Sequence, residues 1–165
     1  MVHSTYTAAL QLSLRAAGAA GLALGLGQLL RLPFPIYAMI SAVVVTDLDP
    51  AETRKLGLPR LTGTVLAATL GALICVLLSP GSWEVGLGVL LAMFLSHLLR
   101  LQGAAKVAGY VCGIVVFAYD DTPWSYALHR TIETVIGIAL AVLISLVPKL
   151  LRDDEERNRS SPTLR

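Results

Sequence analysis

The sequence predicts an all-α membrane protein with six transmembrane helices, arranged as two inverted three-helix repeats. Three observations predict this class. The chain of 165 residues is 55% hydrophobic with a mean hydropathy of +0.70, values that soluble domains of this length rarely reach. Its apolar residues gather in long runs that charges and prolines separate. Its two halves also resemble each other when the chain is shifted by 70 residues.

Six apolar runs approach the length of about 20 residues that a helix needs to cross a bilayer core. Prolines and acidic residues separate the runs, which is typical of interhelical joints. The predicted spans cover residues 6–32, 34–48, 60–79, 83–100, 104–119 and 128–151. They form one module over residues 1–151, and we expect the charged segment 152–165 to be a disordered cytoplasmic tail.

The first run is expected to be a retained helix and not a signal peptide. No basic segment precedes it, and it contains no clear cleavage site. Arg15 lies about 14 Å along this helix from Tyr6, near the middle of the membrane. A charge at that depth costs roughly 2.5–3.5 kcal/mol on insertion scales. Arg15 should therefore face protein, water or an acid, unless its side chain snorkels to the cytoplasmic interface.

The second and fifth runs are unusually short for transmembrane spans. The second run has about 15 residues and starts at prolines, and the charge-free part of the fifth, residues 107–119, has about 13. Short spans at corresponding positions of two halves indicate the binding region in transporters built from inverted repeats. We therefore expect the functional centre between these runs and the third and sixth runs beside them.

The third and sixth runs carry the repeat. RLTGTVLAATLGALI, which starts at Arg60, is identical at six of fifteen positions to RTIETVIGIALAVLI, which starts at Arg130. An acidic pair and a proline precede each arginine by about ten residues. Because each half holds three spans, an odd number, the second copy would cross the membrane in the opposite sense.

The two arginines are predicted to head their helices on opposite sides of the membrane. One interpretation makes them interfacial anchors with a local acid, Asp49 for Arg60 and Glu133 for Arg130. The other places them at opposite ends of an anion path, because a guanidinium binds a carboxylate through two parallel hydrogen bonds. In that case Arg15 and Lys106 would add to the path. The acids Asp47, Asp49 and Glu133 would pair with these cations or carry protons.

Small residues recur every four positions in most of the runs. Lipid tails are as apolar as leucine, so helices in membranes gain by close backbone approach across small faces. The residues assigned to helix packing are Gly21, Gly25, Gly63, Ala67, Gly71, Gly109, Gly113 and Gly137. The two cysteines, Cys75 and Cys112, lie within apolar runs and are expected to be buried small hydrophobic residues.

Lysine and arginine in the joints predict the orientation, because cytoplasmic loops carry an excess of them. Only Arg31 and Arg130 lie on the side predicted to be external. The basic residues predicted to be cytoplasmic are Arg54, Lys55, Arg60, Arg100, Lys106, Lys149, Arg152, Arg157, Arg159 and Arg165. Both termini are therefore expected in the cytoplasm.

Several function classes find no support in the sequence. It contains no nucleophile elbow, zinc-protease motif or phosphate loop, so we expect no enzyme. It has no metal-ligand spacing, and we expect neither a metal nor a cofactor. The net charge of +2 and the lack of a basic, aromatic patch argue against binding of nucleic acid.

The run PIYAMISAVVVTDLDPAETRKLGLPRLTGTVLAATLGA resembles the membrane module of the fusaric acid resistance and aromatic acid exporter family. That family shows an R-x-x-G-T-x-x-G-x-x-x-G-like helix. Ala67 stands where a glycine is common, and the residues that match are Arg60, Gly63, Thr64 and Gly71. The closing helix of the module is similar to the run with Arg130, Glu133, Thr134 and Gly137. The likeness covers the six predicted spans, and the plant aluminium-activated malate channels are distantly similar.

The resemblance implies export of small organic anions, often aromatic carboxylates, across a bacterial inner membrane, driven by the proton gradient. A passive organic-anion channel and a non-transporting membrane scaffold remain alternatives. Many family members have a second membrane module or a large cytoplasmic domain, whereas this chain stops about 14 residues beyond its last predicted span. Six short helices alone enclose little space, so we expect a homodimer or higher homo-oligomer in the lipid bilayer.

Overall fold

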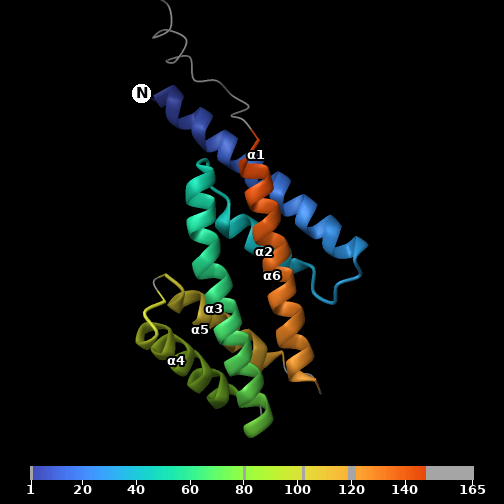
Figure 1. The fold of residues 1–165 in the computed structure, drawn as a ribbon, viewed down its shortest axis with the longest axis vertical. Helices are drawn as coiled ribbons and strands as arrows, with labels where there is room; N and C mark the ends of the chain where they lie inside the picture. Colours follow the sequence, from blue (N-terminus) through green and yellow to red (C-terminus); the bar gives the residue numbers. More distant parts are fainter. Residues whose placement is uncertain (1, 80, 102, 119–121, 148–165) are drawn as a thin grey trace, which may run out of the picture.

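The computed structural model describes residues 2–79, 81–101, 103–118 and 122–147 of the chain (Figure 1). This part of the chain folds into helices and contains no strand. The helices are α1 (Val2–Leu29), α2 (Ile36–Val45), α3 (Pro50–Leu77), α4 (Ser82–Leu98), α5 (Ala105–Phe117) and α6 (Pro123–Ser145). The all-α class and the order of the elements are as the sequence predicts. The charged tail lies outside the described residues.

Three helices begin several residues earlier than the sequence predicts, and the first of them starts at Val2 and not at residue 6. The third was expected to start at residue 60, but α3 starts at Pro50, where the Asp49 carboxylate accepts a hydrogen bond from the Ala51 N–H at 2.8 Å. This N-cap and the proline at the first helical position favour a helix start, although the following turns are polar. The sixth helix likewise starts at Pro123 and not near residue 128.

The six helices fall into two length classes. Three of them, α1, α3 and α6, are long and apolar enough to cross a membrane. The other three, α2, α4 and α5, have 10, 17 and 13 residues. At about 1.5 Å per residue, α2 and α5 extend only about 15 and 20 Å, which is well short of a bilayer core. These two helices correspond to the short second and fifth runs of the sequence.

The helices pack in a crossed arrangement around α3 and α6, which lie side by side at the centre (Figure 1). The short helix α2 packs mainly against α6 and α1, whereas α5 packs mainly against α3 and α4. Between the two central helices, α2 thus contacts α6 far more than α3, and α5 contacts α3 far more than α6. The pattern of contacts is retained when α1, α2 and α3 are exchanged for α4, α5 and α6.

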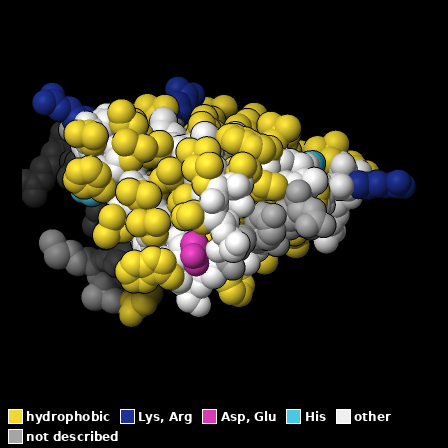
Figure 2. All heavy atoms as spheres, turned by 90° about the horizontal axis from the view of Figure 1, so that it is seen from below, with side chains coloured by type: hydrophobic (Ala, Val, Ile, Leu, Met, Phe, Trp, Pro, Cys, Tyr) yellow, Lys and Arg dark blue, Asp and Glu magenta, His cyan; other side chains and the backbone are white. Residues whose placement is uncertain are grey.

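The outer surface is apolar, as expected for a protein surrounded by lipid. Figure 2 shows one face covered largely by hydrophobic side chains, with basic side chains near its edges. Large apolar side chains such as Leu22, Leu90 and Phe117 are 57%, 62% and 85% exposed. Water would disfavour such exposure, whereas hydrocarbon does not. The chain is therefore a multi-pass membrane protein.

Candidate functional site

Arg60 of α3 is buried at the centre of the molecule, with 1% of its surface exposed. Its Nε and Nη2 donate hydrogen bonds to Ser41 Oγ of α2 at 3.2 and 3.1 Å. The guanidinium carbon lies 5.3 Å from the ring centre of Tyr110 on α5, which is within cation–π range. Nη1 has no hydrogen-bond partner among the described residues. Arg60 therefore joins three helices and keeps a donor unused.

Arg130 of α6 is buried to the same extent and lies on an aromatic group. Its guanidinium carbon is 3.3 Å from the ring centre of Tyr37 on α2. The Tyr37 hydroxyl shares a 2.9 Å hydrogen bond with the Tyr126 hydroxyl, and the Phe34 ring lies 4.9 Å from the Tyr126 ring. Within the described chain, Arg130 Nε and Nη1 find no hydrogen-bond partner. An arginine with unused donors thus lies against a small group of aromatic rings.

Glu133 lies one turn after Arg130 and is completely buried. Its Oε1 accepts a hydrogen bond from the Phe34 N–H at 2.9 Å, and Oε2 has no partner in the described residues. The ion pair that the described residues form is Lys55–Glu52 at the surface, so no described carboxylate pairs directly with Arg60 or Arg130. The interpretation from the sequence that Glu133 is the local salt-bridge partner of Arg130 is therefore not supported by the contacts of the described residues.

We name Ser41, Tyr37, Arg60, Tyr110, Arg130 and Glu133 the central cluster. The two guanidinium groups lie against successive turns of α2, because Arg60 bonds to Ser41 and Arg130 lies over Tyr37, four residues earlier. Arginine stays charged in proteins, so the central cluster holds two positive charges against at most one negative charge. Buried polar atoms normally have hydrogen-bond partners, because an unpaired one loses the hydration it had in water. The central cluster therefore has the charge and the unused donors that an anion would satisfy.

The structure corrects the predicted placement of the two arginines. They were expected to head their helices at opposite ends of a path, but they lie about three and two turns inside α3 and α6, and both contact the short helix α2. The threonine one turn after each arginine donates to its backbone carbonyl, Thr64 to Arg60 at 2.8 Å and Thr134 to Arg130 at 2.9 Å. The two arginines thus share a local structure as well as a location.

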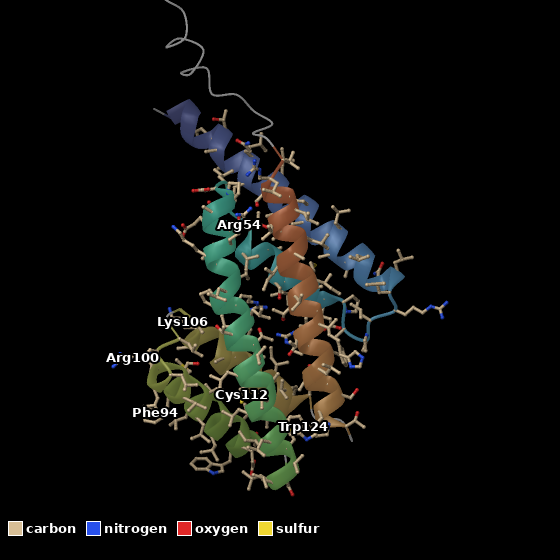
Figure 3. All side chains as sticks on the ribbon, in the orientation of Figure 1. Arg54, Phe94, Arg100, Lys106, Cys112 and Trp124 are labelled. Atoms are coloured by element: carbon tan, nitrogen blue, oxygen red, sulfur yellow. The ribbon has the colours of Figure 1, made fainter. Side chains whose placement is uncertain are left out.

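The other predicted path residues lie away from the central cluster. Arg15 is buried, and its Nη1 and Nη2 donate to the carbonyls of Leu48 and Val147 at 2.8 and 2.6 Å. It therefore joins α1 to the α2–α3 connection and to the end of α6. Lys106 is exposed at the start of α5, on the same flank as Arg54 and Arg100 (Figure 3).

The two aspartates of the α2–α3 connection serve its backbone. Asp47 Oδ1 accepts from the Asp49 N–H at 3.0 Å, and Asp49 caps α3. The Asp47 N–H in turn donates to the Thr53 hydroxyl at 3.0 Å. The interpretation that Asp49 is the acid partner of Arg60 is therefore not supported by the contacts of either side chain.

Most of the small residues lie at helix contacts, as predicted. A Cβ on Gly63 would come 2.9 Å from the Ala104 carbonyl oxygen, and one on Gly71 would come 2.8 Å from Val115 Cβ. Gly109 and Gly113 face α4 in the same way, Gly137 faces the α2 backbone, and Ala67 is fully buried. By contrast, a Cβ on Gly21 or Gly25 would meet nothing within 4 Å in the described chain. Cys75 and Cys112 are free and buried, as expected (Cys112 in Figure 3).

Three cluster residues that matter to the geometry were not singled out from the sequence, namely Ser41, Tyr37 and Tyr110. A signal was present for the tyrosines. Each is a polar aromatic residue in one of the two short apolar runs, and they lie 73 residues apart, close to the repeat spacing of 70. Which guanidinium each ring contacts depends on the crossed packing of α2 and α5, which no local pattern reveals.

Comparison with known proteins identifies the family. A comparison with curated proteins and one with solved structures gave no match. The profile of the family described as fusaric acid resistance protein-like matches residues 22–144, which cover the last two turns of α1, all of α2 to α5 and nearly all of α6. The matched segment is well over half of the chain and contains the whole central cluster. The chain therefore belongs to the fusaric acid resistance protein-like family of membrane transporters.

Proposed function

We propose that this protein exports small organic anions, with aromatic carboxylates as the substrate class, and that the central cluster binds the carboxylate. The observation that carries the proposal is the set of unused donors on two buried arginines, Arg60 Nη1 and Arg130 Nε and Nη1. Two guanidinium groups supply parallel hydrogen bonds that match the two oxygens of a carboxylate. The described residues offer these donors no alternative acceptor.

The aromatic part of the substrate class rests on the surroundings of Arg130. The Phe34 ring lies 6.0 Å from the Tyr37 ring and 4.9 Å from the Tyr126 ring, so the three rings form one group beside the guanidinium. Aromatic rings favour offset or edge-to-face contacts with one another at such distances. Fusaric acid, after which the family is named, is itself an aromatic carboxylic acid.

We infer that the two halves of the chain are an inverted repeat and that α2 and α5 are its discontinuous short helices. The exchange of α1, α2 and α3 for α4, α5 and α6 preserves the packing, and it relates the Arg60–Tyr110 contact to the Arg130–Tyr37 contact. Arg31 and Arg100, which follow α1 and α4, also share positive φ angles of 52° and 55°. In transporters of this type the substrate site lies near the bilayer midplane between the repeats.

We infer that Arg54, Arg100 and Lys106 face the cytoplasm of a bacterial inner membrane, with both termini on that side. The three side chains lie on one flank of the molecule, away from Trp124 at the start of α6 (Figure 3). The excess of basic residues on cytoplasmic loops supports this assignment. The small face of α1 at Gly21 and Gly25 has no partner in the described chain, and a second copy is the partner we propose for it in a homodimer.

Uptake of labelled hydroxybenzoate into liposomes, with and without a pH gradient, tests the function. We expect saturable flux that a pH gradient stimulates. Arg130→Gln should abolish the flux, and Arg130→Lys should retain little of it, because an ammonium cannot replace the planar donor fork. Arg31→Gln, an exposed arginine outside the central cluster, is the matched control and should transport normally.

The alternatives predict different results in the same assay. Flux that is independent of the gradient in the wild-type protein would favour a passive anion channel. No flux of hydroxybenzoate or of a panel of other organic anions, with protein that elutes as a single folded species, would favour a membrane scaffold. Equal flux in the wild type and in Arg130→Gln would remove the central cluster from the path.

A further inference from the structure

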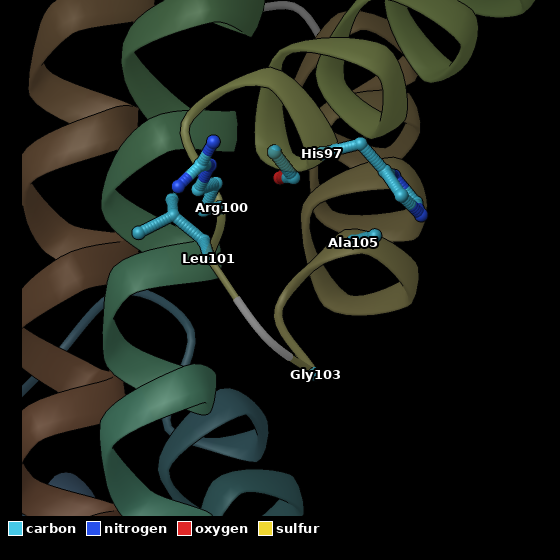
Figure 4. A pocket seen from close by; sticks show the side chains of 6 residues that line it. His97, Arg100, Leu101, Gly103 and Ala105 are labelled. Carbon is cyan, nitrogen blue, oxygen red and sulfur yellow. The ribbon is translucent and has the colours of Figure 1, made fainter.

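A second polar hollow lies outside the central cluster, between the end of α4 and the start of α5 (Figure 4). Its volume is about 420 Å³. The residues that line it are Ser96, His97, Arg100, Leu101, Gly103 and Ala105. Gly103 of this hollow lies next to α3, because a Cβ added to it would lie 3.6 Å from Pro59 of that helix. No acidic side chain is among its lining residues.

Ser96 supplies an unused polar group at this hollow. The residue is completely buried, and its hydroxyl has no hydrogen-bond partner within the described parts of the chain. Serine and threonine within helices commonly bond to the carbonyl one turn earlier. The other buried hydroxyl residues that the structure describes all have partners: Ser41, Thr46, Thr53, Thr64, Thr134 and Ser145. Ser96 is the exception, and it lines a hollow large enough for a ligand.

The N-terminus of α5, the positive end of the helix dipole, also borders the hollow. This helix has 13 residues, and no side chain caps its N-terminus, where Ala104 is the capping residue. The first N–H groups of a helix lack intrahelical partners and attract anions. The C-terminal carbonyls of α4 lie at the same hollow, but two of them already accept hydrogen bonds. The Leu101 N–H donates to the Ser96 carbonyl at 3.0 Å, and the Arg100 N–H donates to the His97 carbonyl at 3.0 Å, so these carbonyls do not repel an anion there as unpaired ones would.

Basic side chains surround the same hollow. Arg100 and His97 line it (Figure 4), and Lys106 lies in the first turn of α5, on the same flank as Arg100 (Figure 3). The Nδ1 atom of His97 lies 2.8 Å from the Met93 carbonyl oxygen, so this nitrogen carries the hydrogen, and Nε2 can donate to an anion only when the ring is protonated. A buried hydroxyl, a helix N-terminus without a side-chain cap and an arginine together form a donor set that suits a phosphate group.

The surroundings indicate where such a phosphate would come from. Phe94, Leu98 and Leu99 are exposed next to the hollow at the end of α4, and they are 64%, 67% and 53% exposed. An apolar surface beside a phosphate site matches the acyl chains and headgroup of a phospholipid. The clustering of Arg100 and Lys106 on the proposed cytoplasmic flank is typical of contact with the anionic lipids of that leaflet.

We propose that this hollow binds a phosphate group, and that its source is the headgroup of an anionic phospholipid. The site is separate from the central cluster and does not depend on the transport function proposed above. Its donors are the Ser96 hydroxyl, the Arg100 guanidinium and the N-terminal N–H groups of α5. Electrostatic attraction brings the headgroup to the site, and the buried hydroxyl and helix end fix its orientation.

The test uses the full chain in a neutral detergent. Native mass spectrometry would measure binding of phosphatidylglycerol, with phosphatidylcholine as the zwitterionic comparison, to the wild type, Ser96→Ala, Arg100→Gln and Arg31→Gln. Arg31 is a matched control because it follows α1 with a φ of 52°, close to the 55° of Arg100. The substituted glutamine therefore has nearly the same backbone conformation in both variants. We expect Ser96→Ala and Arg100→Gln to weaken phosphatidylglycerol binding by about tenfold each, as the loss of a charge-assisted hydrogen bond would. Arg31→Gln should bind as the wild type does.

Three results would overturn the proposal. Equal binding of phosphatidylglycerol by all four proteins would exclude the hollow as the site. Equal binding of the two lipids would exclude recognition of an anionic headgroup. Displacement of phosphatidylglycerol by millimolar inorganic phosphate, with no preference for the lipid, would assign the site to a soluble phosphate. The Ser96→Ala protein should unfold at no lower temperature than the wild type in lipid-free detergent, so a drop would indicate a structural role for the hydroxyl.

Discussion

The guanidinium carbon of Arg130 lies 3.3 Å from the ring centre of Tyr37, and the corresponding distance from Arg60 to Tyr110 is 5.3 Å. In each case an arginine of a long helix contacts a tyrosine of the short helix from the opposite half of the chain. The two contacts differ in length, so the two arginines do not contact their tyrosines equally closely.

The close contact predicts a specific role for the Tyr37 ring. Tyr37→Leu removes the cation–π contact and should weaken binding of an aromatic carboxylate by about 1–2 kcal/mol, a factor of about 5–30. Tyr37→Phe retains the ring face and loses only the hydrogen bond to Tyr126, so its effect should be smaller. Titration of purified protein with hydroxybenzoate measures both. Equal dissociation constants for the wild type and Tyr37→Leu would show that the ring is not part of the site.

Glu133 is the acid of the central cluster, and we propose that it carries the coupled proton. Glu133→Gln preserves the shape and the acceptor for the Phe34 N–H, but the amide cannot bind or release a proton. We expect downhill flux of hydroxybenzoate to continue in this variant while its stimulation by a pH gradient is lost. Glu52→Gln, which breaks the surface pair with Lys55, should remain coupled. Unchanged coupling in Glu133→Gln would assign the proton to another group.

Gly137 lies where α6 packs directly against the backbone of α2. A Cβ there would collide with the Ala38 carbonyl oxygen and lie 2.8 Å from Ser41 Cβ. Because the obstacle includes backbone, Gly137→Ala should destabilise the protein by about 1–3 kcal/mol. Gly21→Ala is the matched control, since nothing in the described chain lies within 4 Å of its Cβ, and the better helix propensity of alanine should stabilise α1 slightly. Thermal unfolding in detergent measures both, and a stable Gly137→Ala protein would contradict the close packing.

Gly21→Ala also tests the proposed dimer. If a second copy covers this face of α1, the added methyl group should disturb the contact and lower the dimer fraction without lowering the stability of the protomer. Analytical ultracentrifugation in detergent distinguishes the two effects. A dimer fraction equal to that of the wild type would place the interface elsewhere.

Arg15 has a structural role in this arrangement, as the link between α1 and two distant segments. Arg15→Gln should lose the hydrogen bonds to the Leu48 and Val147 carbonyls, each of which involves a charged donor and contributes about 1.5–3 kcal/mol. Faster hydrogen exchange at the end of α6 is the expected result. Arg54→Gln, an exposed arginine of α3, should exchange as the wild type does. Unchanged exchange near Ser145 in Arg15→Gln would show that the link does not hold that helix end.

The sequence by itself determined the class, the order of the six helices, the short length of α2 and α5, and the presence of arginine in the third and sixth runs. These properties follow from hydropathy, proline placement and spacing, which act over a few turns of chain. The starts of α3 and α6 were misplaced because polar or proline-containing turns precede the apolar part, and the capping interactions of Asp49 and the prolines decide those boundaries.

Only the tertiary structure decided which helices meet and therefore what the arginines contact. Hydropathy gives every run a similar apolar surface, whereas the pairing of α2 with α6 and of α5 with α3 depends on small faces fitting against distant backbone, as Gly137 fits against Ala38 and Gly63 against Ala104. That pairing buries Arg60 and Arg130 together, sets each against a tyrosine of the other half, and leaves Arg15 bonded to carbonyls instead. The physical reason is that helix association in a membrane depends on complementary shape between segments far apart in the chain, which no local pattern encodes.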